Sequence, residues 1–373
     1  MEAAMGNKPY IWMLAAVLVF AVILPQKGPK RKYYIFVMTV LHTCLCGFRY
    51  MFITGDLHKY YYSFLECGEA GWFSSVIWEG LRNSGFLLFN KIVYILSEGD
   101  FQVLLFLIAL IIHVILGYVI YRYSTAPWMS YLIWNCMTFY LFGFNAIRQA
   151  LAMSLVMLAF IGVSERKPGW FMITMTLACL CHRPALVFIP SYWLATRSIN
   201  ARMVLFYVLL GAAIYVFRNQ FVTFIKDFYY DEETTWNVSS NVGSRMIMIT
   251  GFTVMSILLT GLYDHDYRAL FHLMAISAIL QMLSSFDNVF TRLTDYCFQF
   301  LVLYLPMVFF KGGNKPLRIM LRPLLPFNAR SRKVFAGLVC MFLLWYYFAL
   351  CLNQPIGYEV DNVINYRSMW DVK

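Results

Sequence analysis

The stretch FGFNAIRQALAMSLVMLAF (residues 142–160) is apolar along most of its length and long enough to form a helix that crosses a bilayer. Its beginning nevertheless carries Asn145, Arg148 and Gln149. On a helix these three residues and Ala152 stand at i, i+3, i+4 and i+7, so they share one face. A guanidinium buried in a membrane costs on the order of a few kcal/mol unless an anionic group compensates it. The stretch therefore predicts a membrane helix with a polar site at its start.

The composition of the whole chain also indicates a membrane protein. Hydrophobic residues make up 61% of the 373 residues, aromatic residues 18% and charged residues only 13%. This balance is typical of many bilayer spans with aromatic side chains at their ends. The first apolar run, Tyr10 to Leu24, is followed by the basic sequence PQKGPKRK and lacks a small-residue cleavage site, so we expect it to be retained.

Apolar runs compatible with spanning helices recur along the chain, and some are short enough to require tilting or local thinning of the bilayer. We expect an all-α, polytopic integral membrane protein with about 12 transmembrane helices in a single domain over residues 1–373. The expected spans are 10–25, 33–48, 101–121, 127–143, 146–163, 169–181, 184–195, 203–217, 245–262, 269–283, 297–310 and 334–352.

The distribution of Lys and Arg predicts the orientation of these spans. If residues 26–33 are cytoplasmic, the cytoplasmic segments hold 17 basic and 3 acidic residues, and the outer segments hold 13 basic and 16 acidic residues. Cytoplasmic loops of membrane proteins are enriched in Lys and Arg. Both termini and the loops 49–100 and 218–244 are therefore expected outside, and the basic loop 311–333 inside. The net charge of +11 then follows from topology, and we expect no nucleic-acid partner.

Further cations are expected at the same depth as Arg148, near the outer membrane edge. Arg49 ends the second apolar run, His182 and Arg183 follow the sixth, and Arg292 precedes the eleventh. Each could be a residue whose charged end reaches the headgroup region. Arg is also the side chain suited to bidentate phosphate binding. Four cationic positions at one level favour an outward-facing site for an anionic, phosphate-bearing ligand.

Polar partners for these cations are also present. Asn288, Arg292, Asp295 and Tyr296 stand at i, i+4, i+7 and i+8, so they form a stripe on one helical face. Asp56, beside Gly55 and upstream of an aromatic run, suits a loop folded over a polar substrate. A catalytic metal is not expected, because the chain has no His-Glu-x-x-His motif or clustered Asp pair.

Three other histidines, His42, His113 and His272, lie within apolar runs. We expect them to pack in the protein interior or to form hydrogen bonds between helices. They are not candidates for the outer polar site.

The sequence FNAIRQALAMSLVMLAF, followed by SERK and then CHRPAL, resembles the EpsG/Wzy family of membrane polysaccharide polymerases. The resemblance implies a multi-pass protein of the bacterial inner membrane with the architecture of C-type glycosyltransferases. It extends over most of the chain through Arg49, Gly55, Asp56, Tyr60, Arg292, Tyr296 and Pro306.

The resemblance implies a reaction at the outer face of the inner membrane, in O-antigen, capsule or exopolysaccharide synthesis. A growing glycan would pass from undecaprenyl diphosphate to a lipid-linked repeat unit. The expected partners are these undecaprenyl-diphosphate-linked units and membrane lipids, with a chain-length regulator and a flippase as further candidates. No cofactor is expected, because the lipid diphosphate is itself the activated donor, and the reaction is expected to be metal-independent.

This chemistry assigns roles to the polar residues. Guanidinium groups stabilise the charge that develops on the departing diphosphate, and a base, His182 or Asp56, takes the proton of the acceptor hydroxyl. The candidate catalytic residues are Arg148, His182 and Asp56, and the candidate substrate-binding residues are Arg49, Asn145, Gln149, Arg183, Arg292 and Tyr296.

Other functions remain open at this point. A flippase or transporter of lipid-linked oligosaccharides also needs outward cations for a diphosphate, although the sequence shows no paired, Gly- or Pro-broken helices in its two halves. An O-antigen-type ligase would share nearly the same site. A glycan O-acyltransferase is a further alternative.

Overall fold

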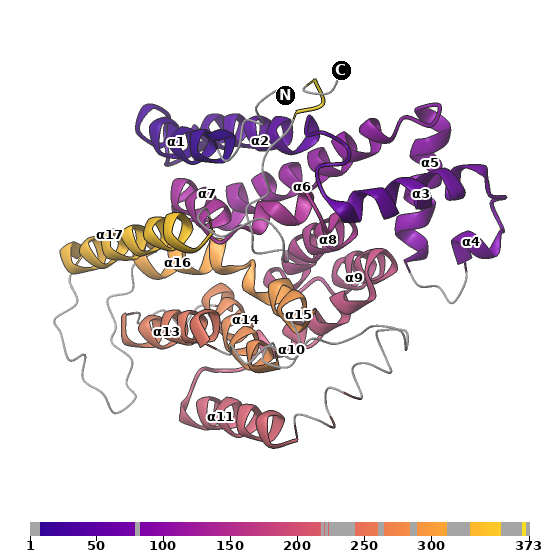
Figure 1. Ribbon diagram of the computed structural model, residues 1–373. Coiled ribbons are helices and arrows are strands. Elements are labelled where there is room, and N and C mark those ends of the chain that lie inside the picture. The colour runs from indigo at the N-terminus through magenta and orange to yellow at the C-terminus, as the bar shows by residue number, and fades with distance from the viewer. Residues whose placement is uncertain are drawn as a thin grey trace. The chain divides into compact units, whose positions relative to one another are not determined.

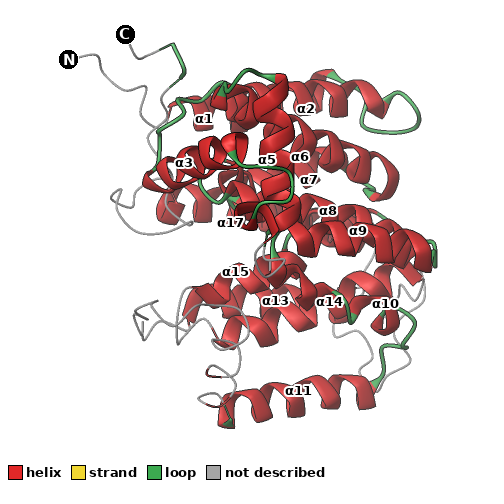
Figure 2. Ribbon diagram, turned by 90° about the vertical axis from the view of Figure 1, so that its right-hand side faces the viewer, coloured by secondary structure: helices red, strands yellow, loops and turns green. Residues whose placement is uncertain are grey.

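The computed structural model describes residues 8–78, 83–217, 220, 223, 243–259, 265–283, 289–311, 329–351 and 368–370. Within these ranges the chain is built from helices, and Figure 2 shows no strand among them. The one β pairing described is an isolated antiparallel bridge between Arg49 and Ser368. The expected all-α class is therefore confirmed for the described part of the chain.

The chain divides into two compact units. Unit 1 comprises Met1–Ala159, Met172–Arg183 and Leu338–Lys373, and unit 2 comprises Phe160–Phe171 and Pro184–Gly337. Among the described elements, a boundary between the units falls within α8 (Ile147–Ser164), α9 (Pro168–Cys181), the 3₁₀ helix η3 (Arg183–Phe188) and α17 (Ala329–Tyr346).

Unit 1 contains the N-terminal helices, drawn from indigo to magenta in Figure 1. The helix α2 packs along α6, α3 packs on α5, and α1 contacts α7 and α2. The described elements of its first segment, Met1–Ala159, are α1 (Lys8–Ile23), α2 (Arg31–Gly47), α3 (Gly55–Glu69), α4 (Ser75–Trp78), α5 (Ser84–Leu96), α6 (Phe101–Tyr123), α7 (Pro127–Cys136), the 3₁₀ helix η2 (Phe139–Gly143) and the first part of α8.

The contact between α2 and α6 depends on glycine. A Cβ atom on Gly117 of α6 would lie 2.5 Å from Thr39 Oγ1 and 3.3 Å from Ile35 Cγ2. A Cβ atom on Gly47 of α2 would lie 2.7 Å from Phe106 Cδ2. Small residues let membrane helices approach closely and gain van der Waals contact.

The same helix pair is joined at its other end by Arg31. Its guanidinium donates to the Ser124 carbonyl at 3.0 Å and to the Tyr121 carbonyl. These oxygens belong to the C-terminal end of α6, where backbone carbonyls have no partner in their own helix and the helix dipole favours a cation. Arg31 therefore caps α6 from the start of α2.

Buried polar side chains connect the helices of unit 1. His42 Nδ1 donates to the Met38 carbonyl at 2.7 Å, and Asn135 Nδ2 of α7 donates to His42 Nε2 at 2.9 Å. His113 bonds within its own helix, to the Ala109 carbonyl at 2.8 Å. The expected hydrogen bond between helices is confirmed for His42.

Unit 2 is organised around α14 (His265–Met282), which contacts five other helices of the unit. Residues around its whole circumference are buried, as expected for a central helix. His272 Nδ1 accepts a hydrogen bond from Tyr207 at 2.7 Å, which confirms a second predicted contact between helices. The five neighbours are α10 (Ser191–Leu194), α11 (Ala201–Val216), α13 (Gly243–Leu259), α15 (Val289–Phe298) and α16 (Leu301–Phe310).

The expected span 127–143 is not one helix. α7 ends at Cys136, and the short η2 begins at Phe139. Between them Thr138 takes a φ of 59°, in the left-handed region that L-residues other than Gly seldom adopt. This turn ends α7 and redirects the chain before α8.

The expected span 184–195 is also interrupted. It consists of the 3₁₀ helix η3 (Arg183–Phe188) and the four-residue α10. Pro190 lies between them, and proline lacks a backbone N–H and disfavours helical geometry in the residue before it, which accounts for the interruption.

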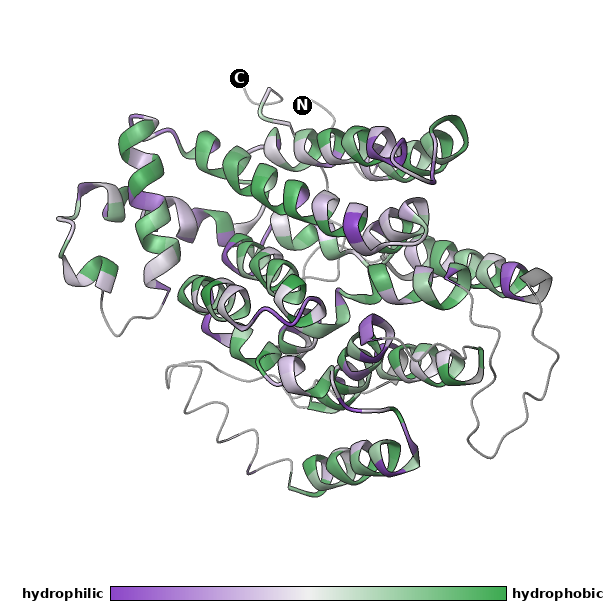
Figure 3. Ribbon diagram, turned by 180° about the vertical axis from the view of Figure 1, so that it is seen from behind, coloured by the Kyte–Doolittle hydropathy of each residue, from purple (hydrophilic) through white to green (hydrophobic). Residues whose placement is uncertain are grey.

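Three helices of the described chain are long and apolar enough to cross a membrane: Phe101–Tyr123, Ile147–Ser164 and Arg332–Ala349. A fourth span exists if Phe290–Phe298 and Leu301–Phe310, bent by 41° at their junction, count as one. Other apolar helices are shorter, and Figure 3 shows hydrophobic residues along most of them. The structure is thus compatible with a membrane protein, while the number of spans stays a prediction.

The structure describes most of the expected outer loop 49–100 but little of the loops 218–244 and 311–333. The described residues of the segment 49–100, which leave out 79–82, include the helices α3, α4 and α5. Nearly all of 218–244 and residues 312–328 of the basic loop lie outside the described residues.

Replacing Gly117 by Leu should destabilise unit 1, because a larger side chain has no room between α6 and Thr39. Overpacking of this kind costs about 1–3 kcal/mol, so the thermal unfolding midpoint in detergent should fall. Gly251→Leu is the control, because a Cβ atom on Gly251 has nothing within 4 Å. Equal midpoints for the two variants would contradict the close α2–α6 contact.

Candidate functional site

The residues Asn145, Arg148 and Gln149 lie at the start of α8, in unit 1. α8 begins at Ile147, so Arg148 and Gln149 stand in its first turn. Asn145 lies before the helix, where its amide bonds back to the Leu141 carbonyl at 3.2 Å. The expectation that all three share a helical face is therefore wrong for Asn145, because the chain is still turning out of η2 at that position.

Arg148 is half-buried, and its Nε atom is fully buried. Within the part of the chain that the structure describes, this Nε has no hydrogen-bond partner. A buried donor without a partner costs roughly 1–3 kcal/mol, and more when it is charged. A charge-assisted bond to an anionic ligand would remove this cost, so the atom marks the candidate anion site.

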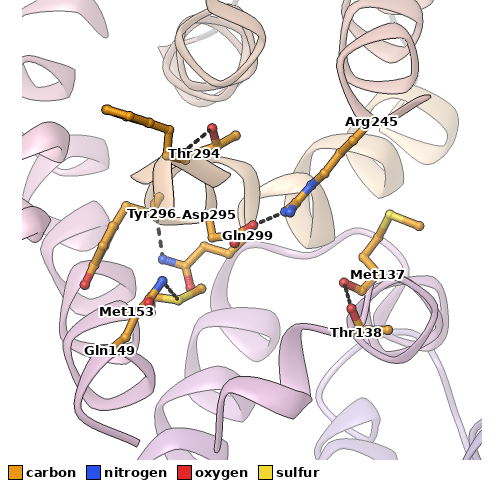
Figure 4. Close-up of polar contacts among 10 residues, drawn as sticks. Met137, Thr138, Gln149, Met153, Arg245, Thr294, Asp295, Tyr296 and Gln299 are labelled. Atoms are coloured by element: carbon orange, nitrogen blue, oxygen red, sulfur yellow. Dashed lines mark hydrogen bonds and ion pairs between the residues drawn. The ribbon is translucent and has the colours of Figure 1, made fainter. Parts of the chain in front are cut away.

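Gln149, the next residue of α8, is almost fully buried in unit 1. Its Nε2 points toward Met153 Sδ, 3.8 Å away, one turn along α8 (Figure 4). Met153 lines a small, mostly apolar cavity. The other lining residues are Ile112, Trp134, Phe139, Phe142, Gly143, Ala150, Ser154 and Met157.

Arg49 lies beside the segment that leads into α8. Its Cζ is 5.3 Å from the centroid of the Phe144 ring, and its Nη1 donates to the Cys46 carbonyl. The side chain has no exposed surface. The Arg49 guanidinium is thus held inside unit 1, and its expected role in substrate binding stays a prediction.

His182 and Arg183 follow the C-terminal end of α9, also in unit 1. The His182 amide donates to the Ala178 carbonyl at 2.8 Å, and Arg183 begins η3. Both side chains are half-buried. They are therefore accessible at a helix junction, as a base or an anion-binding residue needs to be.

Asp56 lies in the first turn of α3 and not in a loop, so that expectation is wrong. The partial positive charge of a helix N-terminus favours a carboxylate there. Lys59 Nζ is 3.9 Å from its carboxylate, and the Asp56 side chain is 41% exposed. Asp56 is open to solvent, and its position has a structural explanation without any ligand.

Arg292 and Tyr296 lie on α15, in unit 2. Arg292 is half-buried, and Tyr296 is fully buried. The Tyr296 carbonyl accepts a hydrogen bond from Gln299 Nε2 at 3.2 Å (Figure 4). The burial of Tyr296 makes it part of the packing of unit 2. Asn288, the first member of the predicted stripe, lies outside the described residues.

Asp295, on the same helix, forms an ion pair that the sequence did not reveal. Arg245 of α13 donates to its carboxylate, which is almost fully buried (Figure 4). The Arg245 Cζ also lies 5.1 Å from the centroid of the Phe298 ring. Arg245 stands at the start of an apolar run, as Arg148 does. A cation in that position was the sequence signal that could have identified Arg245.

No metal site is evident in the described ranges, where no group of three or more His, Cys, Asp or Glu side chains could hold a metal ion. The candidate site residues fall into two sets. Unit 1 holds Arg49, Asp56, Asn145, Arg148, Gln149, His182 and Arg183, and unit 2 holds Arg292 and Tyr296.

Gly143→Ala should disturb the entry to α8, because a Cβ atom there would lie 2.9 Å from Cys46 Sγ. The thermal unfolding midpoint should fall by a few degrees for a cost of about 1 kcal/mol. Removing the sulfur with Cys46→Ala should restore most of this loss in the double variant, which measures the coupling directly. Additive effects of the two substitutions would show that they do not meet.

A family model provides an independent comparison. The model of the EpsG family matches residues 32–368, which is nearly the whole chain and includes every candidate site residue. No curated protein and no solved structure shows a significant match.

Proposed function

The chain belongs to the EpsG family, and on this basis we propose that it is a membrane glycosyltransferase of the polysaccharide-polymerase type. It transfers a growing glycan from undecaprenyl diphosphate to a lipid-linked repeat unit. Family membership over nearly the whole chain supports this function. The apolar helices support a site within a membrane.

The observation that carries the proposal is the buried Nε of Arg148, which has no partner among the described residues. In the proposed reaction the acceptor hydroxyl attacks the anomeric carbon, and the bond between this carbon and the diphosphate oxygen breaks. Negative charge develops on the diphosphate as it leaves. A guanidinium aimed at that oxygen stabilises the transition state more than the ground state.

The acceptor hydroxyl must lose its proton to a base. His182 is the preferred candidate, because it lies in unit 1 with Arg148 and is partly accessible. Asp56 is the alternative, since its carboxylate is open to solvent. Asn145, Gln149 and Arg183 are proposed to bind the substrate. The same role is proposed for Arg49, Arg292 and Tyr296.

The proposal includes a topology. About 12 transmembrane helices form a single domain of C-type glycosyltransferase architecture in the bacterial inner membrane, with both termini on the outer side. The acceptors and donors are glycans of an O-antigen, capsule or exopolysaccharide pathway. Membrane lipids, a chain-length regulator and a flippase are the proposed partners, and the reaction needs no metal or other cofactor.

A lipid-linked oligosaccharide flippase is the second candidate, and the bend between α15 and α16 favours it. Broken helices form substrate sites in many transporters. Purified protein incubated with lipid-linked repeat units separates the candidates. A ladder of longer glycans identifies a polymerase, and a single transfer of the glycan identifies a ligase. Movement of the lipid-linked unit between the membrane leaflets without glycan transfer identifies a flippase. Acyl transfer to the glycan would identify an O-acyltransferase.

Arg148→Ala should reduce polymerisation on the order of 10²–10³-fold, which corresponds to the loss of one charge-assisted contact worth about 2–4 kcal/mol in the transition state. Turnover of purified lipid-linked units measures the effect. Arg202→Ala is the matched control, because Arg202 is an exposed arginine in unit 2. Near-native turnover of correctly folded Arg148→Ala would mean that this side chain only reaches toward the headgroups.

His182→Ala should depress transfer while leaving binding of the lipid diphosphate largely intact, since a base acts on the acceptor proton and not on the donor. Donor binding and turnover are measured on the same preparation. If His182→Ala abolishes binding while Asp56→Ala stops only transfer, the roles are reversed and Asp56 is the base.

Single cysteines in place of Lys27 and Lys59 test the topology. Both lysines are exposed, and the charge distribution predicts Lys27 inside and Lys59 outside. In intact cells a membrane-impermeant thiol reagent should label the cysteine at 59 and not the cysteine at 27. Labelling of position 27 from outside would invert the scheme.

A further inference from the structure

Three residues near the C-terminus, Ser368, Met369 and Trp370, dock on the end of α2 in unit 1. Ser368 forms the antiparallel bridge with Arg49, and the Met369 amide donates to the Phe48 carbonyl at 2.9 Å. The Trp370 ring lies against the Phe48 ring with centroids 5.3 Å apart. Backbone pairing and ring packing thus hold the same two residues, Phe48 and Arg49.

Arg49 extends this contact to the start of α8. Its guanidinium lies over the Phe144 ring and donates to Cys46, whose Sγ is 3.4 Å from Nη1. Cys46 in turn leaves no room for a Cβ atom on Gly143. Gly143 and Phe144 are the last residues before Asn145, so Arg49 contacts the segment that determines where α8 begins.

We propose that Ser368–Trp370 is a positioning element for the Arg148 site. These residues fix Phe48 and Arg49, and Arg49 fixes Phe144 and thereby the first turn of α8, which carries Arg148. The proposal rests on the proposed function, because it assigns this contact an effect on turnover as well as on stability. Since a misplacement of about 1 Å can lower an enzymatic rate 100-fold, a small shift of Arg148 is sufficient.

The burial of Arg49 supports a positioning role. A fully buried guanidinium is costly unless its geometry and hydrogen bonds are well defined, and such groups are retained in some proteins because they specify one arrangement. Arg49 contacts the C-terminal segment on one side and Phe144 on the other. A shift of the C-terminal segment would therefore move Arg49, and with it Phe144.

The expected topology agrees with this contact. The distribution of Lys and Arg places the end of α2 and the C-terminus on the same side of the membrane. A bridge between Arg49 and Ser368 requires that they share a side. The contact comes from the structure and the sidedness from charge, so the two observations are independent.

Met369 offers a matched pair of variants. Met369→Pro removes the N–H that bonds to Phe48, and the extended backbone of Ser368 in the bridge is compatible with a following proline. Met369→Ala keeps the N–H and changes only a side chain that is 37% exposed. We expect Met369→Pro to lower kcat roughly 10- to 100-fold with little change in donor KM. Met369→Ala should behave as the unmodified protein.

Trp370 gives a second pair, which decides the matter if Met369→Pro fails to fold. Trp370→Ala removes the ring packed on Phe48 and should lower kcat in the same way. Trp370→Phe keeps an aromatic ring and should restore most of the rate. A purely stabilising segment predicts a lower thermal midpoint with unchanged kcat in the folded fraction, and that result would overturn the proposal.

Alkylation of Cys46 gives a readout that does not depend on the reaction. Cys46 is buried, and Arg49 contacts its sulfur. N-ethylmaleimide modification at this position, located by mass spectrometry, should be slow in the unmodified protein and in Met369→Ala. It should be faster in Met369→Pro and Trp370→Ala because Arg49 is released.

The two readouts distinguish the possible failures. Unchanged alkylation and unchanged kcat in Met369→Pro and Trp370→Ala would show that the segment does not hold Arg49. Faster alkylation with unchanged kcat would show that Arg49 does not position the site. If the unmodified protein forms no polymer, the proposed function fails, whereas the alkylation of Cys46 still reports whether the segment fixes Arg49.

Discussion

The structure around the candidate site depends on the burial of one charged side chain, Arg49. Its backbone forms the antiparallel bridge to Ser368, and its guanidinium faces an aromatic ring and a backbone carbonyl. Gln102 of α6 donates a hydrogen bond from its Nε2 to the Arg49 carbonyl, with a distance of 3.1 Å. Four separate parts of unit 1 therefore meet at this residue.

Much of the helical framework could be predicted, because long apolar runs leave few alternatives in a bilayer. Without water to satisfy backbone N–H and C=O groups, a spanning segment must pair them internally. The starts of α6 and α8 lie within one residue of the predicted runs that begin at 101 and 146. The apolar runs predicted the helices least well at the positions where helices are interrupted. Pro184 and Pro190 were visible in the sequence, but the left-handed turn at Thr138 has no sequence signature.

The candidate site could be proposed from sequence because a charge at the head of an apolar helix is visible there. This signal singled out Arg148. What a charge pairs with is a property of the fold, so the ion pair between Arg245 and Asp295 could not be derived from spacing along one helix. The complete burial of Arg49 was likewise hidden, because its guanidinium packs on Phe144 and its backbone pairs with Ser368, and both are distant in sequence.

Unit 1 brings residues after 338 into contact with residues before 160. Tyr140 of η2 forms a hydrogen bond of 3.0 Å with Tyr347, 207 residues later, in addition to the contact between Arg49 and Ser368. A membrane protein enters the bilayer as it is synthesised, and its N-terminal helices are in place while later ones are still being made. The segment around residues 139–149 and the neighbouring Arg49 therefore acquire these contacts only after residues 347 and 368 have been made. A chain released before residue 347 would lack both contacts and leave its candidate site open on one side.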